Sequence, residues 1–593
     1  MKIYLKRIPQ LLSLSLAACL LFAGCGGDQP GGSKEMNFVR VRLAAEPDYI
    51  NPIITVNAYS RMVFSGMYQS LLDFDPYTME LVPVLATDRP IIENIDSGPY
   101  AGGISYTFEI RPEADWDDGR PITGEDIAFT LKTYFHPGIP LAAPGRSVLE
   151  SFVDVVADPN NPKEFTIVSN TRYFLGEAAI GTLSILPAHV YDPDGVLKKV
   201  PMADWNNPEK AAVMTEASPE LAAFAEKFMN SAGGRAPSDH LGSGPYSLVS
   251  WETGQRIILK RKANWWADKV TPSGPGLRAY PDSLVYVIIQ DQTTAVTALK
   301  AQEIDVMTQI DAKEYVNLLQ DENFKSMFTL HNPEVFQVYY IGINMKNPKL
   351  NDKRVRRAVA QSLDIDALID QLFFGLAKRV VGPFHPAKSL YNKDLKLLSY
   401  DPEQARALLK EAGWEDTNGN GTVDKNIGGQ LTELELDYLT TAGSTMGQNI
   451  ALLFQQNAAK SGIKINIQSL NPDVMRQSLD NRTFELFGRG WSTDGLPDDP
   501  SQYWARASDR PGGGNYFGFG TEESDSLIEQ IKVTMDDQAR NKLYYRLQEI
   551  IYDEQPCIFL LAPQERIAIS NRFKARTSAT RPSFFVSDFE LQE

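Results

Sequence analysis

Oxygen-bearing side chains recur at regular spacing in one short segment of the chain. Asp416, Asn418, Asn420 and Asp424 occupy positions 1, 3, 5 and 9 of a calcium-binding loop pattern, and a glycine occupies position 6. Position 12, which normally supplies a bidentate Glu, is Ile427. The pattern predicts a weak or partial Ca²⁺ site. The alternative is an Asx-rich turn, in which such side chains bind their own backbone.

Sequence motifs of catalysis are absent. The chain contains no G-x-S-x-G, H-E-x-x-H, G-x-x-x-x-G-K-S/T or C-x-x-C. The five histidines are scattered, with no two at metal-ligand spacing, and each is interpreted as structural: His136, His189, His240, His331 and His385. We therefore expect no enzyme and no required cofactor. A hydrolase stays a remote alternative, because a nucleophile and a base can meet from distant positions.

The N-terminus predicts export and lipid attachment. Basic residues precede an apolar stretch over 11–23, which is too short to span a bilayer. The stretch ends in a lipobox-like sequence, in which small residues precede Cys25, the expected lipidation site. Cys19 is the alternative, but apolar residues follow it, whereas 26–33 is typical of a flexible polar tether.

Length and charge limit the classes of partner. A chain of 593 residues is too long for one hydrophobic core, so two or three domains are expected. The formal net charge of −17 disfavours nucleic acid and anionic headgroups and is compatible with cationic or zwitterionic ligands. Processing at Cys25 would remove Cys19 and lipidate Cys25, so that Cys557 would be the one free cysteine and no internal disulfide could form. Its apolar surroundings predict a buried thiol in a strand.

Short β-like runs alternate with amphipathic helices, which indicates mixed α/β domains. The expected strands cover 255–261, 283–290 and 336–344, the first two as neighbours. The expected helices cover 211–230 at the surface, 352–374, 401–413 and the stripe 543–551. For the helix over 401–413, Asp401 supplies the N-cap and Pro402 the first helical position. The basic side chains Arg354, Arg356 and Arg357 are interpreted as helix-surface residues.

Several short motifs follow one another in a fixed order. They are LVPVLA at 81–86, YTFEIRP at 106–112, WDDGRPIT at 116–123, EDI at 125–127, GSGPY at 242–246, Trp251, NWW at 264–266, GINM at 342–345 and DKRVRRAV at 352–359. Together they make the chain resemble the oligopeptide/dipeptide/nickel-binding family of solute-binding proteins of ABC transporters. The resemblance covers nearly the whole mature chain.

The resemblance implies an α/β, two-lobed periplasmic-binding-protein-like fold of type II with an additional α+β domain and a ligand cleft between the lobes. The implied segments are a signal peptide 1–24, a tether 25–36, lobe I from 37–73, 240–335 and 563–593, an extra domain 74–239, and lobe II 336–562. Enclosure of a ligand by a closing lobe requires a partner for each buried charge.

The resemblance also implies a ligand site. Asp494 falls on the family position whose carboxylate holds the α-ammonium of a bound peptide, and Trp491, Thr493 and Tyr516 are expected beside the ligand. A short peptide, delivered to an ABC permease by a lipid-anchored, extracytoplasmic monomer, is the expected function. The alternatives are a nickel chelate, haem, opine or oligosaccharide as ligand, and a signalling or adhesion lipoprotein.

Overall fold

The structure is a computed structural model that describes residues 37–592, apart from 56, 143–145, 147 and 272–273. Cys19, Cys25, the signal segment and the tether lie outside the described residues. Within the described part, no helix combines the length and the apolar composition that crossing a membrane requires.

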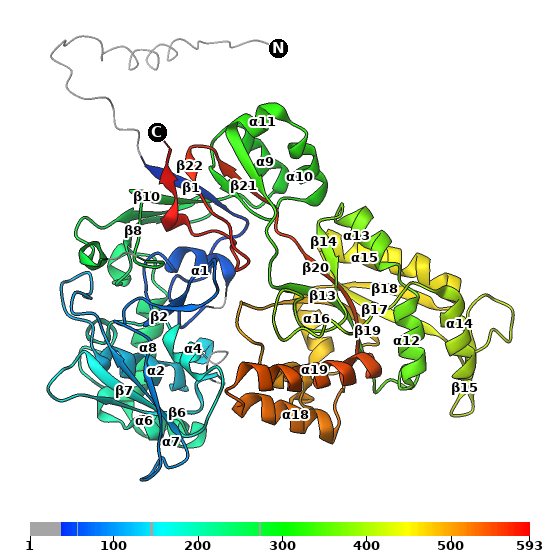
Figure 1. Cartoon of the computed structure of the whole chain (residues 1–593), viewed down its shortest axis with the longest axis horizontal. Coiled ribbons are helices and arrows are strands. Elements are labelled where there is room, and N and C mark those ends of the chain that lie inside the picture. Colours follow the sequence, from blue (N-terminus) through cyan, green and yellow to red (C-terminus); the bar gives the residue numbers. More distant parts are fainter. Residues whose placement is uncertain (1–36, 56, 143–145, 147, 272–273, 593) are drawn as a thin grey trace, which may run out of the picture. The chain divides into compact units, whose positions relative to one another are not determined.

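Lobe I is built on a seven-stranded sheet (Figure 1). Its strands, in spatial order, are β12 (Phe328–His331), β21 (Ile567–Ser570), β11 (Val306–Met307), β1 (Phe38–Leu43), β10 (Ser283–Ile288), β9 (Arg256–Arg261) and β8 (Tyr246–Glu252). Strand β1 pairs in parallel with β10 and β11. Val39, Val41 and Leu43 alternate along β1 and are buried, as a two-residue period requires of one sheet face. Helices α1 (Ala58–Phe64), α9 (Gln292–Lys300), α10 (Ala312–Leu319) and α11 (Glu322–Met327) complete the lobe.

The extra domain has a four-stranded antiparallel sheet and several helices. The strands, in spatial order, are β4 (Ile91–Asn94), β5 (Ile104–Glu109), β7 (Glu164–Ser169) and β6 (Phe152–Ala157), and a hairpin of β2 (Leu72–Phe74) and β3 (Leu81–Pro83) precedes them. The longer helices are α2 (Gly124–Phe135), α7 (Pro208–Ala217) and α8 (Pro219–Ala232); the shorter ones are α4 (Gly176–Gly181), α5 (Ala188–Tyr191) and α6 (Met202–Trp205). One hydrophobic cluster joins this domain to lobe I, since Tyr106 and Phe165 belong to the same core as Val39.

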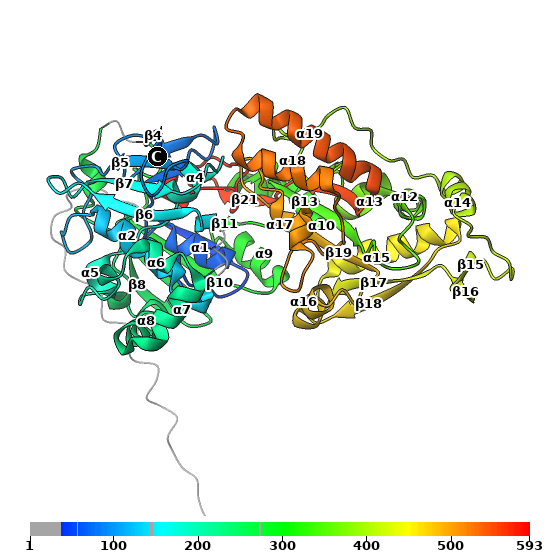
Figure 2. The same cartoon turned by 90° about the horizontal axis from the view of Figure 1, so that it is seen from below.

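Lobe II has a six-stranded sheet in the order β14 (Ala377–Arg379), β20 (Cys557–Pro563), β13 (Gln337–Ile343), β19 (Leu486–Ser492), β17 (Glu435–Thr441) and β18 (Lys464–Leu470). Its helices are α12 (Lys353–Gln361), α13 (Ile365–Leu372), α14 (Pro402–Glu411), α15 (Thr445–Ala458), α16 (Pro472–Asp480), α17 (Ser501–Trp504), α18 (Glu522–Val533) and α19 (Asp537–Glu554). Ile341 of β13 faces one hydrophobic cluster and Tyr340 faces another, so the sheet is covered on both faces. The two views in Figures 1 and 2 show α18 and α19 side by side.

The chain crosses between the two large sheets at two adjacent segments. One crossing, 332–336, joins β12 to β13, and the other, 564–566, joins β20 to β21. The crossings are bonded to each other: Glu334 and Gln564 form a β-bridge, and the Glu565 amide donates to the Pro333 carbonyl at 2.9 Å. Two short paired segments therefore connect lobe II to lobe I.

Most expected elements are present near their predicted bounds. Strands β9 and β10 pair antiparallel, as expected of neighbours, and β13 covers the third predicted strand. Helix α14 begins as predicted, with the Asp401 carboxylate accepting from the Gln404 amide at 2.9 Å. Cys557 is a buried free thiol in β20.

Two predicted helices are each divided in the structure. The helix expected over 352–374 is interrupted between α12 and α13, where Asp364 is extended and caps α13 by accepting from the Ala367 amide. The helix expected over 211–230 is divided before Pro219, because a proline disfavours helical backbone at the residue before it. Ser218 is extended there and caps α8.

The prediction that Arg356 lies on a helix surface is wrong. The residue is 1% exposed, and its guanidinium donates to the backbone carbonyls of Leu350, Asn351 and Glu554 and to the Glu554 carboxylate. Arg354 is exposed and pairs with Asp352, as a surface residue would. Arg356 therefore ties α12 to the end of α19.

Candidate functional site

The loop 493–500 continues from β19 and carries the predicted ammonium-binding residue. It starts next to a crossing segment, because the Thr493 amide donates to the Phe336 carbonyl at 2.8 Å. Strand β19 is fixed beneath the loop by antiparallel pairing with β13, in which Ser492 lies opposite Gln337. The loop therefore emerges where lobe II joins the rest of the folded body.

The loop contains three carboxylates, and their partners differ. Asp498 accepts from the Lys388 ammonium at 2.7 Å, and Asp499 accepts from the Tyr173 hydroxyl of the extra domain at 2.9 Å. Asp494 is exposed and accepts only from the Leu496 amide of its own loop, at 2.9 Å. Among the described residues no cation lies within ion-pair distance of Asp494, so its charge is available to a ligand.

Lys388 holds the loop in place from below. Its side chain is 3% exposed, and its ammonium also donates to the Leu496 carbonyl at 2.8 Å and lies over the Phe336 ring, 5.6 Å from the ring centre. The Tyr544 hydroxyl of α19 donates to the Asp498 carbonyl. Burial raises the pKa of Asp498, and the adjacent Lys388 charge counteracts that effect. These contacts fix the part of the loop that follows Asp494.

The predicted ligand contacts at Trp491 and Thr493 have different surroundings. The Trp491 indole N–H donates to the Pro383 carbonyl at 2.9 Å, and its ring lies 4.0 Å from the Tyr340 ring and 5.8 Å from the Tyr503 ring, centre to centre. Trp491 is therefore a half-buried packing residue with one side left to the surface. Thr493 is exposed, next to Asp494.

Two arginines lie close to the ring of Tyr516. The Arg482 guanidinium carbon is 5.1 Å and that of Arg489 is 5.9 Å from the centre of the Tyr516 ring, within cation–π range. Arg489 is exposed, and among the described residues no carboxylate lies within 4.0 Å of it. Arg489 is not among the ligand contacts expected from the sequence. The signal for it was its spacing, because residues two apart on a strand share one face, and Arg489 stands two residues before Trp491 on β19.

Gly495 is packed against Met79, a residue of the turn between β2 and β3. A Cβ atom on Gly495 would overlap the Met79 Cε and lie 3.0 Å from its Cβ and Cγ. Met79 itself has φ of 63°, a left-handed conformation that is uncommon for a residue other than glycine. The side chain of Met79 thus covers the residue that follows Asp494, from outside lobe II.

A second contact between the extra domain and lobe II surrounds Phe174. Its amide donates to the Lys532 carbonyl at the end of α18 at 3.0 Å, and the Arg540 guanidinium lies 4.7 Å from its ring. Phe174 packs against one of the lobe II clusters. Together with the Tyr173–Asp499 hydrogen bond, this contact brings the extra domain against the loop that carries Asp494.

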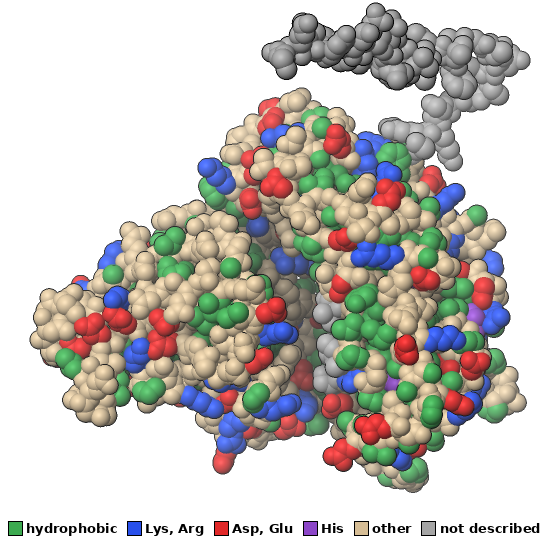
Figure 3. Space-filling model, turned by 180° about the vertical axis from the view of Figure 1, so that it is seen from behind, with side chains coloured by type: hydrophobic (Ala, Val, Ile, Leu, Met, Phe, Trp, Pro, Cys, Tyr) green, Lys and Arg blue, Asp and Glu red, His purple; other side chains and the backbone are tan. Residues whose placement is uncertain are grey.

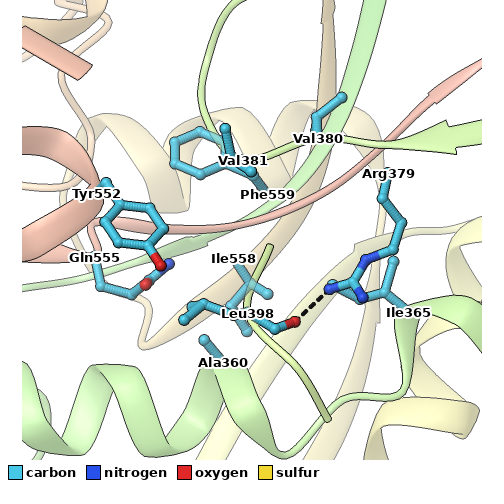
Figure 4. A pocket seen from close by; sticks show the side chains of 10 residues that line it. All are labelled: Ala360, Ile365, Arg379, Val380, Val381, Leu398, Tyr552, Gln555, Ile558 and Phe559. Carbon is cyan, nitrogen blue, oxygen red and sulfur yellow. Dashed lines mark hydrogen bonds between the residues drawn. The ribbon is translucent and has the colours of Figure 1, made fainter. Parts of the chain in front are cut away.

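Figure 3 shows the surface hollowed along the boundary between lobe II and the rest of the folded body, with acidic and basic side chains intermingled around it. A separate small cavity of about 20 Å³ lies inside lobe II, lined mainly by apolar side chains, with the Arg379 guanidinium pointing to the Leu398 carbonyl (Figure 4). That volume accommodates about one water molecule. It is too small for a ligand the size of a peptide.

The segment with calcium-loop spacing forms a compact turn next to the β15 (Asp424–Ile427) and β16 (Gln430–Glu433) hairpin. The Asp416 carboxylate accepts from the amides of Gly419, Asn420 and Gly421 at 2.8–3.1 Å. The Asp424 carboxylate accepts from the Thr417 amide and hydroxyl. Asn418 and Asn420 donate to Glu433. Among the described residues no group of three or more His, Cys, Asp or Glu side chains is arranged to hold a metal.

Comparison with known proteins agrees with this architecture. Residues 80–514 match the family model of bacterial extracellular solute-binding proteins, family 5. The oligopeptide-binding protein AppA of Bacillus subtilis is 24% identical over 581 residues, which cover 95% of each chain.

Solved structures show the same arrangement of elements. The structure of B. subtilis AppA in complex with a nonapeptide has a TM-score of 0.68 at 23% identity and covers 94% of this chain and 99% of its own. That of NikA from Brucella suis in complex with Fe(III)-EDTA has a TM-score of 0.74 at 17% identity and covers 94% and 100%. The fold and the site define a two-lobed binding protein of type II with an extra domain. The chain belongs to the family of bacterial extracellular solute-binding proteins, family 5.

Proposed function

We propose that this protein captures a short peptide outside the cytoplasm and delivers it to the permease of an ABC transporter, without changing the ligand chemically. The observation that carries the proposal is the exposed carboxylate of Asp494, the one acid of the loop 493–500 that lacks a partner beyond its own loop among the described residues. A peptide α-ammonium would supply the missing positive charge.

The surroundings of Asp494 support a peptide as ligand. Trp491 and Arg489 lie on β19, the strand that leads into the loop of Asp494, and the Tyr516 ring lies within cation–π range of Arg489. Arg489, which has no ion pair among the described residues, can bind a carboxylate or a backbone carbonyl. The B. subtilis relative is an oligopeptide-binding protein, which agrees with this choice.

The two bonded crossings supply the hinge for ligand enclosure. Rotation at 332–336 and 564–566 would move lobe II as a body, since each lobe keeps its own sheet. Closure would bury the ligand and present a distinct shape to the permease. We place the boundaries of lobe II at 335/336 and 562/563, near these crossings, and those of the extra domain at 73/74 and 239/240.

The N-terminal segment completes the proposal. Lipid attached at Cys25 would hold the body at the membrane by way of the tether, in the periplasm or on the outer face of the cell membrane, as a monomer. Labelling of cells with a radioactive fatty acid tests this: the label should enter the wild-type chain and not a Cys25→Ala variant. Label retained in Cys25→Ala and lost in Cys19→Ala would move the site to Cys19.

Native mass spectrometry tests the ligand class. The soluble body from Met36 should be purified without refolding, so that a ligand captured during expression is retained. A series of bound masses that match short peptides is expected. A single mass that matches a nickel chelate, haem, an opine or an oligosaccharide would contradict the peptide and leave binding for transport in place. Cleavage of a candidate peptide on incubation with the protein would contradict the proposal that the ligand is delivered chemically unchanged.

For the loop 416–424 we propose weak calcium binding at most. Its spacing supplies oxygens from Asp416, Asn418, Asn420 and Asp424, but an ion must compete with the backbone amides that these carboxylates already bind. Millimolar calcium should raise the melting temperature, and an Asp416→Ala variant should not respond. An unchanged melting temperature of the wild type would make the loop structural only.

A further inference from the structure

The extra domain contains a pocket that no part of the proposed peptide site touches. Its volume is about 500 Å³, which lies in the range of small-molecule sites. One wall is a face of α2, with Glu125, Ala128, Phe129 and Lys132 at helical spacing. The opposite wall is the segment 188–198.

Lys132 is the buried charge of this pocket. Its side chain is 8% exposed, and its ammonium donates to the Leu197 carbonyl at 3.0 Å. An ammonium has three donors, and among the described residues Lys132 has no other hydrogen bond and no carboxylate within 4.0 Å. Burial lowers the pKa of Lys132, and the charges of Asp154, Asp192 and Glu125 counteract that effect from beyond 4.0 Å. The unused donors of a buried cation are costly unless a further group binds them, and a ligand carboxylate would do so.

The two buried carboxylates of the pocket already accept hydrogen bonds from the backbone. Both oxygens of Asp126 accept from backbone amides, those of Ala188 and Thr123, at 2.9 Å. Both oxygens of Asp192 likewise accept from the amides that open the short helix at Leu197–Lys199. These two buried acids serve the backbone and are not left for a ligand.

The exposed charges of the pocket are less constrained. Glu125 pairs with Lys198 across the opening at 2.8 Å, and Arg120 lies 3.5 Å from Asp118. Asp194 is exposed and has neither a hydrogen bond nor an ion pair among the described residues. The pocket therefore offers a free donor on its buried side, at Lys132, and a free acceptor on its exposed side, at Asp194.

We propose that this pocket is a second binding site, specific for a small zwitterion of the size of a free amino acid, whose carboxylate binds Lys132 and whose ammonium binds Asp194. A purely anionic ligand would meet four carboxylates in the lining, and a purely cationic one would meet Arg120, Lys132 and Lys198. A zwitterion satisfies both groups, and Phe129 and Pro193 offer apolar surface to its side chain.

Isothermal titration calorimetry of the intact protein with free L-amino acids, one at a time at millimolar concentration, tests the site. Binding of at least one of them is expected. Lys132→Met should weaken it by about tenfold or more, as loss of a charge-assisted hydrogen bond does. Lys227→Met, which removes an exposed lysine from α8, serves as the matched control and should bind as the wild type does.

Two further measurements separate this site from the peptide site and from a folding defect. Asp494→Ala should keep the amino-acid binding; binding that is lost in Asp494→Ala and kept in Lys132→Met would overturn the proposal. The methyl ester and the N-acetyl derivative of the same amino acid should both fail to bind the wild type, which tests the zwitterion without any variant. Binding of both derivatives, or binding of no amino acid, would also overturn it.

Discussion

The ammonium of Lys388 lies 2.7 Å from the carboxylate of Asp498, 110 residues further along the chain, and both side chains are largely buried. The same ammonium reaches the Leu496 carbonyl, two residues beyond Asp494. Lys388 therefore holds the loop that carries Asp494 through contacts at Leu496 and Asp498.

Replacement of Lys388 by Met should destabilise the protein by about 3–5 kcal/mol, because Asp498 would be left buried without its partner. Thermal and urea unfolding should show this loss, and Lys388→Met combined with Asp498→Asn should recover part of it. A Lys388→Met variant as stable as the wild type would show that the pair does not hold the loop.

Removal of the Asp494 carboxylate should abolish tight peptide binding. If Asp494 pairs with an enclosed ammonium, Asp494→Ala should cost about 3–5 kcal/mol, a loss of affinity above about a hundredfold. Fluorescence or calorimetric titration with a captured peptide measures the change. Asp370→Ala, an exposed acid on α13, is the control. Equal affinities of Asp494→Ala and the wild type would refute the assignment.

Gly495 and Met79 should be coupled in ligand binding. Gly495→Ala would place a methyl group against the Met79 side chain and shift the loop, which should weaken peptide binding about tenfold. Met79→Ala removes the obstacle, so the double variant should bind more tightly than Gly495→Ala alone. Additive effects of the two substitutions would mean that the contact does not influence the site.

The stability of the extra domain should depend on pH through His136. This side chain is 0% exposed, and burial lowers its pKa from 6.5 to about 4. Because the folded state binds the proton less tightly than the unfolded state, stability is highest above pH 6.5. Up to about 3 kcal/mol should be lost as the pH falls through 6.5 toward 4.

His136→Asn provides the comparison for this pH dependence. Asn retains an acceptor for the Gly138 amide, which donates to His136 Nδ1 at 3.1 Å, but it does not titrate. Its unfolding free energy should change less between pH 7 and pH 4 than that of the wild type, whatever its absolute value. Parallel pH profiles of the two proteins would assign the acid sensitivity to other groups.

The sequence was sufficient for elements whose signals are local. Helix α14 follows from Asp401 and Pro402, and β10 follows from a β-branched run. The two divided helices show where local patterns were insufficient. At Asp364 the helical spacing of apolar residues continues across the break. The helix is nevertheless interrupted there, because the Asp364 backbone is extended and its side chain caps α13. At Pro219 the proline is itself a local signal for the break, which the expectation of one helix over 211–230 did not take into account.

By itself the sequence determined the α/β class and the order of the family motifs, because these depend on residue types and spacing along the chain. The binding of an ammonium by Asp494 stays a prediction. Only the tertiary structure decided which charges remain free. Arg356 is buried because α12 packs against the end of α19, and Asp498 is paired because Lys388 comes to it from 110 residues away. Among the described residues Asp494 and Lys132 have no ion pair, which only the folded chain reveals.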